Sequence, residues 1–251
     1  MDKNAVQSVE RTFSIMEALS QVPDGLYLND LSKAVGLNKS TVHRLLASLI
    51  ALGYASKIKD TGRYSLTMKM FEVGSKASDR FDILKIARPY LQELSRDVGE
   101  AVHLVIRDGN DVVYIFKEDS GNNSVCMSSR IGFRNPLYCT GVGKAIMAEL
   151  SEEEVKHILE TSSIMQRTVN TITSPAKMLE HLKIVKKRGY AVDDEENELG
   201  VRCVAASITS SSGNVLGAFS VSVPASRMDD EKLLYIADTV LKIKMQICSQ
   251  L

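Results

Sequence analysis

The stretch "YCTGVGKA", Tyr138 to Ala145, has glycines and a lysine at a spacing close to that of a phosphate-binding loop. That loop needs a glycine five positions before the Gly-Lys pair, and a hydroxyl residue after the lysine to hold magnesium. Tyr138 and Ala145 occupy those two positions here, so nucleotide binding is not predicted. Gly141 and Gly143 nevertheless open an apolar run typical of a helix, and the first N–H groups of a helix attract anions of any kind. The stretch therefore predicts a site for some other anion.

Elsewhere the chain offers no recognisable catalytic pair. No local motif places a histidine with Cys203, and a lone cysteine in a strand pattern is typical of small buried packing. His157 and His181 fall on separate helical segments in charged surroundings, which is typical of solvated side chains rather than metal ligands. The four cysteines match neither a metal knuckle nor a disulfide framework. We predict no catalytic residue, no metal site and no cofactor, and we keep an enzyme acting on a small acid as a remote alternative.

Length and composition indicate what class of protein and how many domains must position this site. The chain has 251 residues, 44% of them apolar, and a formal net charge of zero, which suits two domains without a general attraction to nucleic acid or membrane. The N-terminal sequence lacks the unbroken apolar core of a signal peptide, and no apolar run approaches the length of a membrane span. We expect a soluble, cytoplasmic protein with no membrane partner.

The first 66 residues have the pattern of a winged helix-turn-helix. Val9, Phe13, Met16 and Leu19 share one helical face. Two further helices are predicted, with Asn29 and Asn38 as their caps and a tight turn at Gly36 between them. The segments "YASKI" and "RYSL" then alternate like two strands around "KDTG".

Local charge supports DNA binding by this module. From residue 37 to 66, five cationic side chains face the single acidic Asp60, a local net charge of +4. The second helix of such a pair enters the major groove by its N-terminal residues, and the hairpin holds phosphates. The predicted DNA-binding residues are Asn38, Lys39, Ser40, Thr41, His43 and Arg44 in the helix and Lys57, Lys59 and Arg63 in the hairpin.

The rest of the chain is predicted to be a linker helix and a mixed α/β domain. Residues 67–81 form an amphipathic helical pattern too apolar for a solvated linker, so we expect it to pack against another copy. Residues 82–251 predict a helix broken at Pro89, a hairpin around Gly109, a strand at "SVCMSS" and four later helices. Two long strands, residues 203–210 and 215–224, complete a sheet of five or six strands. A helix-covered sheet of this kind suits a small-molecule sensor.

Four motifs of the chain resemble the IclR family of bacterial transcription regulators in order and spacing. They are "LNKSTVHRLLASLIALGY", "YSLTMKMFEVG", "RNPLYCTGVGKAIMAEL" and "GYAVDDEENELGVRCVAASI". The last is the most specific, with the signature positions at Gly189, Asp193, Glu196 and Cys203. The chain departs from the family where Ser207, Thr209 and Ser210 replace a proline, an aromatic residue and an aspartate.

The resemblance implies an α+β protein in which a GAF-like domain binds a small carboxylate between its sheet and the helix after "TGVG". The N–H groups of Gly141, Val142 and Gly143 would then serve the carboxylate, and Asp193 would accept a hydrogen bond from a sugar hydroxyl. The acidic run from Asp193 to Glu198 is otherwise typical of a solvated loop. The implied effector-binding residues are Met127, Arg130, Asn135, Gly141, Val142, Asp193, Cys203, Ser220 and Ser222.

Two stretches, "SSRIGFRNPLY" and "RTVNTITS", are similar to the branch of this family that senses 2-keto-3-deoxygluconate. The resemblance thus implies a repressor that binds a pseudo-palindromic operator as a homodimer or a dimer of dimers. Regulators of aromatic-acid or of glyoxylate- and pyruvate-type metabolism remain the alternatives.

Overall fold

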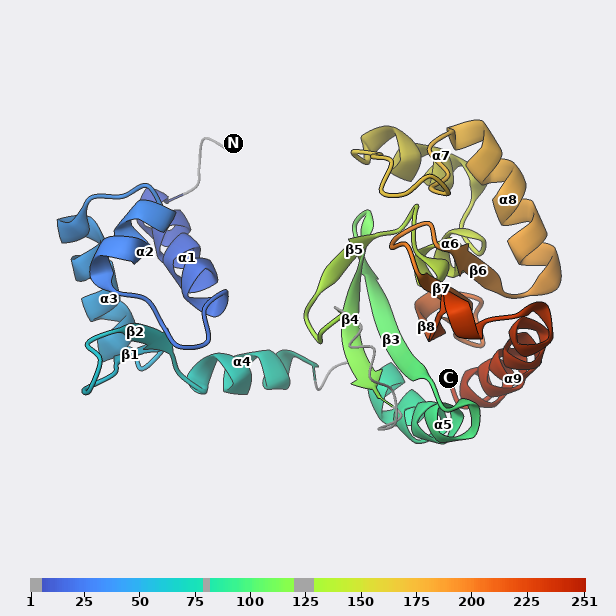
Figure 1. Cartoon of the computed structure of the whole chain (residues 1–251), viewed down its shortest axis with the longest axis horizontal. Coiled ribbons are helices and arrows are strands. Elements are labelled where there is room, and N and C mark those ends of the chain that lie inside the picture. Colours follow the sequence, from blue (N-terminus) through green and yellow to red (C-terminus); the bar gives the residue numbers. More distant parts are fainter. Residues whose placement is uncertain (1–5, 79–81, 120–128) are drawn as a thin grey trace. The chain divides into compact units, whose positions relative to one another are not determined.

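The computed structural model describes residues 6–78, 82–119 and 129–251 (Figure 1). The chain divides into two compact units, Met1–Arg80 and Phe81–Leu251, and each is described by itself. Within the described residues, no helix is long and apolar enough to cross a membrane.

The N-terminal unit contains three helices, a hairpin and a fourth helix (Figure 1). The elements are α1 (Gln7–Ser20), α2 (Leu28–Ala34), α3 (Lys39–Ala51), β1 (Ala55–Lys57), β2 (Tyr64–Leu66) and α4 (Lys69–Ser78). Leu31, Val42 and Leu46 are fully buried at the centre of a core that α1, α2, α3 and the hairpin share. β1 and β2 pair antiparallel, and the turn between them contains Gly62 at a φ of +72°. The predicted winged helix-turn-helix is confirmed.

The apolar face predicted for α1 is only partly covered, and the caps predicted for α2 and α3 need correction. In α1 the core is contacted by Ile15, Met16 and Leu19, whereas Val9 and Phe13 are 50% and 55% exposed. The apolar face of the helix therefore extends beyond the part that its own unit covers. Asn29 lies inside α2, whose N-cap is Tyr27. Asn38 is the N-cap of α3, but its side chain makes no capping hydrogen bond.

The C-terminal unit is built on one six-stranded sheet in the order β5-β4-β3-β8-β7-β6, with every neighbouring pair antiparallel. The strands are β3 (Ala101–Asp108), β4 (Asp111–Glu118), β5 (Arg134–Pro136), β6 (Ala191–Asp194), β7 (Val201–Thr209) and β8 (Val215–Pro224). The predicted hairpins around Gly109 and "SSGN" are present. The short strands β5 and β6 were not predicted, and the strand expected at "SVCMSS" lies almost wholly outside the described residues.

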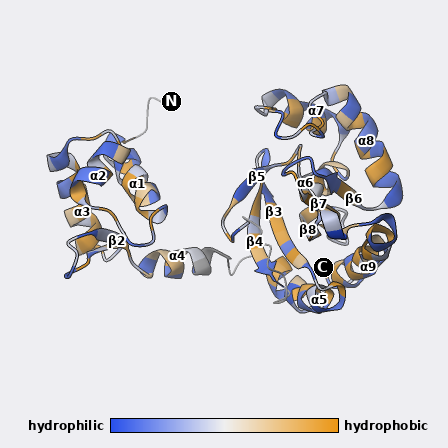
Figure 2. Ribbon diagram, in the orientation of Figure 1, coloured by the Kyte–Doolittle hydropathy of each residue, from blue (hydrophilic) through white to orange (hydrophobic). Residues whose placement is uncertain are grey.

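Helices cover both faces of this sheet (Figure 1), and the strands and the helices that cover them contain many hydrophobic residues (Figure 2). One face packs against α5 (Asp82–Val98) and α9 (Asp230–Cys248), and the other packs against α6 (Gly141–Met147), α7 (Glu152–Thr161) and α8 (Pro175–Arg188). Strand alternation decides which residues face which layer. In β8, Phe219 and Val221 join the core under α5 and α9, so Ser220 and Ser222 point to the α6 side.

Helix α5 runs without interruption through Pro89, where a break was predicted. Proline removes one backbone hydrogen bond from a helix interior. Here Ala87, Leu91 and Leu94 are fully buried against the sheet and α9. This tertiary packing keeps the helix continuous despite the missing donor.

Candidate functional site

The start of α3 presents the predicted DNA-binding side chains to solvent. Lys39, Ser40, His43 and Arg44 are exposed and Thr41 is half-buried, while Val42 and Leu46 on the opposite face are buried in the core. This division is what groove reading requires, because the apolar face fixes the helix and leaves the polar face free.

The hairpin adds cations beside aromatic rings. Lys57 and Lys59 are exposed, and Arg63 is half-buried with its guanidinium 5.0 Å from the ring centre of Tyr27. The contact with Tyr27 gives Arg63 a packing role that the charge count alone did not indicate.

A pocket opens on the α6 side of the large sheet. Each of the strands β3, β4, β5, β6, β7 and β8 contributes at least one lining residue, and the start of α6 contributes others. The lining residues are His103, Tyr114, Ser129, Asn135, Thr140, Gly141, Val142, Asp193, Asn197, Glu198, Val201, Cys203, Ser220 and Ser222. Its side chains are mainly hydroxyl, amide, imidazole and carboxyl groups. Such a lining suits a small polar ligand with several hydrogen-bonding groups.

Seven of the nine predicted effector residues line this pocket, namely Asn135, Gly141, Val142, Asp193, Cys203, Ser220 and Ser222. Arg130 is exposed and is not among the lining residues. Met127 lies outside the described residues. His103, Tyr114, Thr140, Asn197 and Glu198 also line the pocket and were not predicted.

His103 connects several of the pocket hydroxyls. Its Nδ1 lies 3.3 Å from Ser222 Oγ, its Nε2 lies 2.8 Å from Ser129 Oγ, and Cys203 Sγ lies 3.2 Å from Ser222 Oγ. Burial, and to a smaller extent Lys117, lowers the pKa of His103 to about 4. The imidazole is therefore neutral at physiological pH and orders the hydroxyls around it. No sequence motif links His103 to Cys203, because sheet pairing alone brings them together.

Cys203 is a wall residue of the pocket. Burial raises the pKa of its thiol well above the ordinary value, and Asp193 raises it further. A thiol held in its neutral form is a poor nucleophile, in agreement with the prediction that Cys203 packs rather than reacts.

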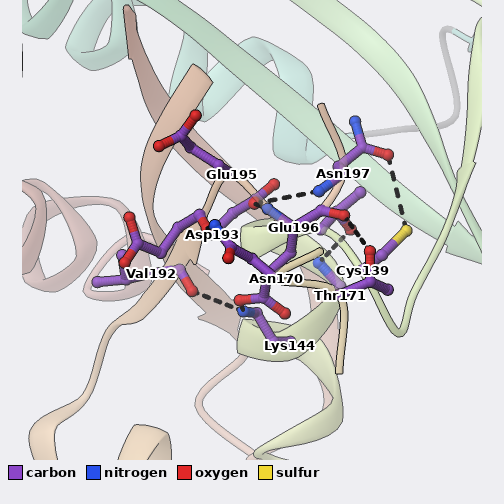
Figure 3. Close-up of polar contacts among 12 residues, drawn as sticks. Cys139, Lys144, Asn170, Thr171, Val192, Asp193, Glu195, Glu196 and Asn197 are labelled. Atoms are coloured by element: carbon purple, nitrogen blue, oxygen red, sulfur yellow. Dashed lines mark hydrogen bonds and ion pairs between the residues drawn. The ribbon is translucent and has the colours of Figure 1, made fainter. Parts of the chain in front are cut away.

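Two carboxyl groups of the acidic run, those of Asp193 and Glu196, point inward (Figure 3), whereas Asp194 and Glu198 are exposed as in a solvated loop. Asp193 and Glu196 are each 4% exposed. Asp193 Oδ1 accepts the Glu196 N–H at 2.8 Å and the Asn197 N–H at 3.4 Å. Burial raises the pKa of Asp193 to about 6, although Lys144 opposes this shift.

Lys144 compensates the charge of the buried Glu196 carboxylate. Its side chain is fully buried, forms an ion pair with Glu196 and donates to Val192 O at 2.6 Å (Figure 3). The lysine that completes "TGVGKA" thus faces a carboxylate of the protein itself, which agrees with the absence of a nucleotide loop in the sequence.

The two glycines of α6 have different surroundings. Thr140 Oγ1 caps the helix by accepting the Gly143 N–H at 3.1 Å, so the expectation that Gly143 serves a ligand is wrong. A Cβ at Gly143 would lie 2.1 Å from Leu137 O, whereas one at Gly141 would lie 3.4 Å or more from its neighbours. Gly141 and Val142 line the pocket, and the helix supplies no intrahelical partners for their N–H groups.

Of the two histidines that were predicted to be solvated, His181 differs from the prediction. It is half-buried on α8, and burial, together with the smaller effects of Lys144 and Arg188, lowers its pKa to about 4.

Comparison with known families matches both units. A family model described as "Bacterial transcriptional regulator IclR C-terminal" matches residues 75–249, and one described as "IclR helix-turn-helix domain" matches residues 8–58.

Individual relatives extend the match along the chain. The chain is 40% identical over 230 residues to the HTH-type transcriptional regulator KdgR of Escherichia coli, covering 92% of this chain and 87% of that protein. It is 32% identical over 243 residues to the transcriptional repressor IclR of Escherichia coli, covering 96% and 89%. Among solved structures, Thermotoga maritima IclR superposes with a TM-score of 0.85 at 32% identity, covering 97% of this chain and 98% of that one.

Proposed function

Since the chain belongs to the IclR family of bacterial transcriptional regulators, we propose that a small carboxylate, bound in the pocket beside α6, controls its binding to operator DNA. We assign DNA binding to residues 1–66, a linker helix to residues 67–81 and effector binding to residues 82–251. α3 and the β1–β2 hairpin contact the operator, and the effector switches the protein between two DNA-binding states.

The observation that carries the proposal is the convergence of Gly141, Val142, Ser220 and Ser222 on one polar pocket. The first two supply N–H groups at a helix start, and the two serines supply hydroxyls from alternate positions of β8. Donors of this kind suit a carboxylate. Asp193 suits a sugar hydroxyl, which it can bind in either protonation state.

We propose 2-keto-3-deoxygluconate as the effector and repression as the mode of control. The lining is mainly polar, which favours a polyhydroxy acid over an aromatic acid. Glyoxylate and pyruvate are the smaller alternatives. Repression is supported by relatives such as the transcriptional repressor IclR.

Calorimetry on the full chain tests the effector with a panel of 2-keto-3-deoxygluconate, glyoxylate, pyruvate and an aromatic acid. We expect binding of the sugar acid in the micromolar to millimolar range, because a metabolite sensor must release its ligand. A gel shift with the adjacent intergenic DNA, with and without the sugar acid, tests control. Absence of binding by every carboxylate would remove the pocket assignment, and absence of a shift would remove the operator assignment.

We further propose that the protein acts as a homodimer or dimer of dimers on a pseudo-palindromic operator. One winged helix reads one half-site, so specificity needs at least two copies. The candidate dimer surface is apolar and exposed within the N-terminal unit. It comprises Val9 and Phe13 on α1 and Met68, Phe71 and Val73 on or beside α4.

Sedimentation at micromolar concentration tests the dimer surface. Phe71→Asp should favour the monomer and weaken operator binding, whereas Lys76→Asp on the same helix serves as the control. A wild-type monomer that still binds its operator tightly contradicts the proposal.

A further inference from the structure

The loop between α7 and α8, residues 162–174, is fastened to the acidic turn, residues 194–198, that borders the pocket (Figure 3). Three of its side chains donate to backbone carbonyls of that turn. The pairs are Thr168 Oγ1 to Glu195 O at 2.6 Å, Thr171 Oγ1 to Glu196 O at 2.7 Å, and Asn170 Nδ2 to Asp194 O at 3.1 Å. The loop is therefore held in a fixed position beside the pocket.

This position brings Arg167 to the rim of the pocket. Its Nη1 donates to Asn197 Oδ1 at 2.7 Å and to Asn135 Oδ1 at 3.3 Å, and both asparagines line the pocket. Asn197 Oδ1 also lies 3.6 Å from the sulfur of Cys139, two residues before Gly141. Arg167 thus stands at the end of the pocket where α6 begins.

The guanidinium retains donors for a ligand. Both hydrogen bonds that its guanidinium makes to described residues use Nη1, so the N–H groups of Nε and Nη2 have no partner among those residues. In the part of the chain that the structure describes, no carboxylate forms an ion pair with Arg167.

Among the described residues, the pocket lining does not supply a cation for an acid. Its ionisable lining includes the carboxyl groups of Asp193 and Glu198 and the imidazole of His103, which is neutral at physiological pH. The nearby ammonium of Lys144 is engaged by Glu196. An anion brought beside these carboxyl groups needs an opposite charge, because an uncompensated charge is costly to bury. Guanidinium groups meet this need well, since two parallel N–H donors match a carboxylate.

We propose that Arg167 binds the anionic group of the effector at the rim of the pocket and selects acids over their uncharged counterparts. The inference rests on the proposed function, because it concerns the carboxylate assigned to the same pocket. Asn135 and Asn197 hold the guanidinium in place, and the start of α6 supplies further donors to the same group.

The test compares 2-keto-3-deoxygluconate with its methyl ester, which keeps the hydroxyls and loses the charge. Calorimetry measures both ligands on the full wild-type chain, on Arg167→Gln and on Arg167→Lys. Arg96→Gln is the matched control, because Arg96 is exposed on α5, which covers the other face of the sheet. The thermal midpoint without ligand shows whether each variant folds.

We expect Arg167→Gln to weaken binding of the acid by about tenfold or more, Arg167→Lys to weaken it less, and Arg96→Gln to leave it unchanged. The ester should bind Arg167→Gln as it binds the wild type. Unchanged acid binding by Arg167→Gln overturns this inference and leaves the proposed function intact. An equal loss of acid and ester also overturns it, since that result indicates a packing role. If the wild type binds no carboxylate of the panel, the proposed effector class and this inference both fall.

Discussion

Lys144 in α6 and Glu196 in the acidic turn form a buried ion pair across 52 residues of sequence. The pair joins the helix that opens the pocket to the turn that follows Asp193. Glu196 Oε2 is buried and has no hydrogen-bond partner within the described residues. The carboxylate therefore depends on Lys144 for most of its compensation.

Replacement of Lys144 by methionine should destabilise the C-terminal unit by about 3–5 kcal/mol, because it leaves a buried carboxylate without its cation. Chemical denaturation measures the change. The double variant Lys144→Met with Glu196→Gln should recover part of the loss, since it removes both charges together. Equal stability of the single and double variants would show that the charge pairing is unimportant.

The pH dependence of stability reports on Asp193. Its pKa is raised from 3.8 to about 6 in the folded protein, so between those values the folded state keeps a proton that the unfolded state has lost. Ionisation of the buried Asp193 carboxyl therefore lowers the free energy of unfolding as pH rises through this window, and the full loss is present above pH 6. Asp193→Asn removes the cost while keeping an oxygen to accept the Glu196 N–H.

We expect the free energy of unfolding of Asp193→Asn, relative to wild type, to rise by on the order of 2–3 kcal/mol between about pH 4 and pH 7. Urea denaturation at several pH values measures it. Other titrating groups cancel in the difference between the two proteins. A difference that stays flat across this range contradicts the raised pKa.

Periodicity was sufficient to predict most of the elements. The helix-turn-helix, both long hairpins and the capped helices follow from local patterns that tertiary packing reinforces. Periodicity failed where packing decides alone. Pro89 breaks a pattern but not the helix, and Val9 and Phe13 continue an apolar face that their own unit leaves uncovered.

The pocket was predicted from family motifs rather than from residue pattern. The positions of two cations near it, Lys144 and Arg167, were not predicted. A lysine after two glycines reads as a solvated or ligand-binding cation, since lysine is almost never fully buried without a partner. The partner of Lys144 is distant in sequence and lies in a run that resembles a solvated loop. Arg167 stands in a loop without periodicity, and only the fold brings it to Asn135 and Asn197.

The two glycines of α6 should respond oppositely to alanine. Gly143→Ala should strongly destabilise the unit, because its Cβ would overlap the carbonyl of Leu137. Gly141→Ala should fold, and Gly141→Val should obstruct the pocket while DNA binding persists. Thermal unfolding and calorimetry with 2-keto-3-deoxygluconate separate the two effects. Full effector binding by Gly141→Val would remove α6 from the pocket assignment.

DNA recognition should depend on the exposed start of α3. Arg44→Ala or Thr41→Ala should weaken operator binding by about 1–3 kcal/mol and leave random DNA less affected, because a base contact is lost. Lys57→Ala and Lys59→Ala in the hairpin should weaken both DNAs about equally and reduce the salt dependence, because phosphate contacts release counterions. Fluorescence anisotropy with operator and random duplexes at several salt concentrations measures all four variants, with Arg96→Ala as the control for loss of charge. Operator binding that survives both α3 substitutions would show that another element reads the bases, since Arg44 and Thr41 lie where the groove-reading end of this helix must be.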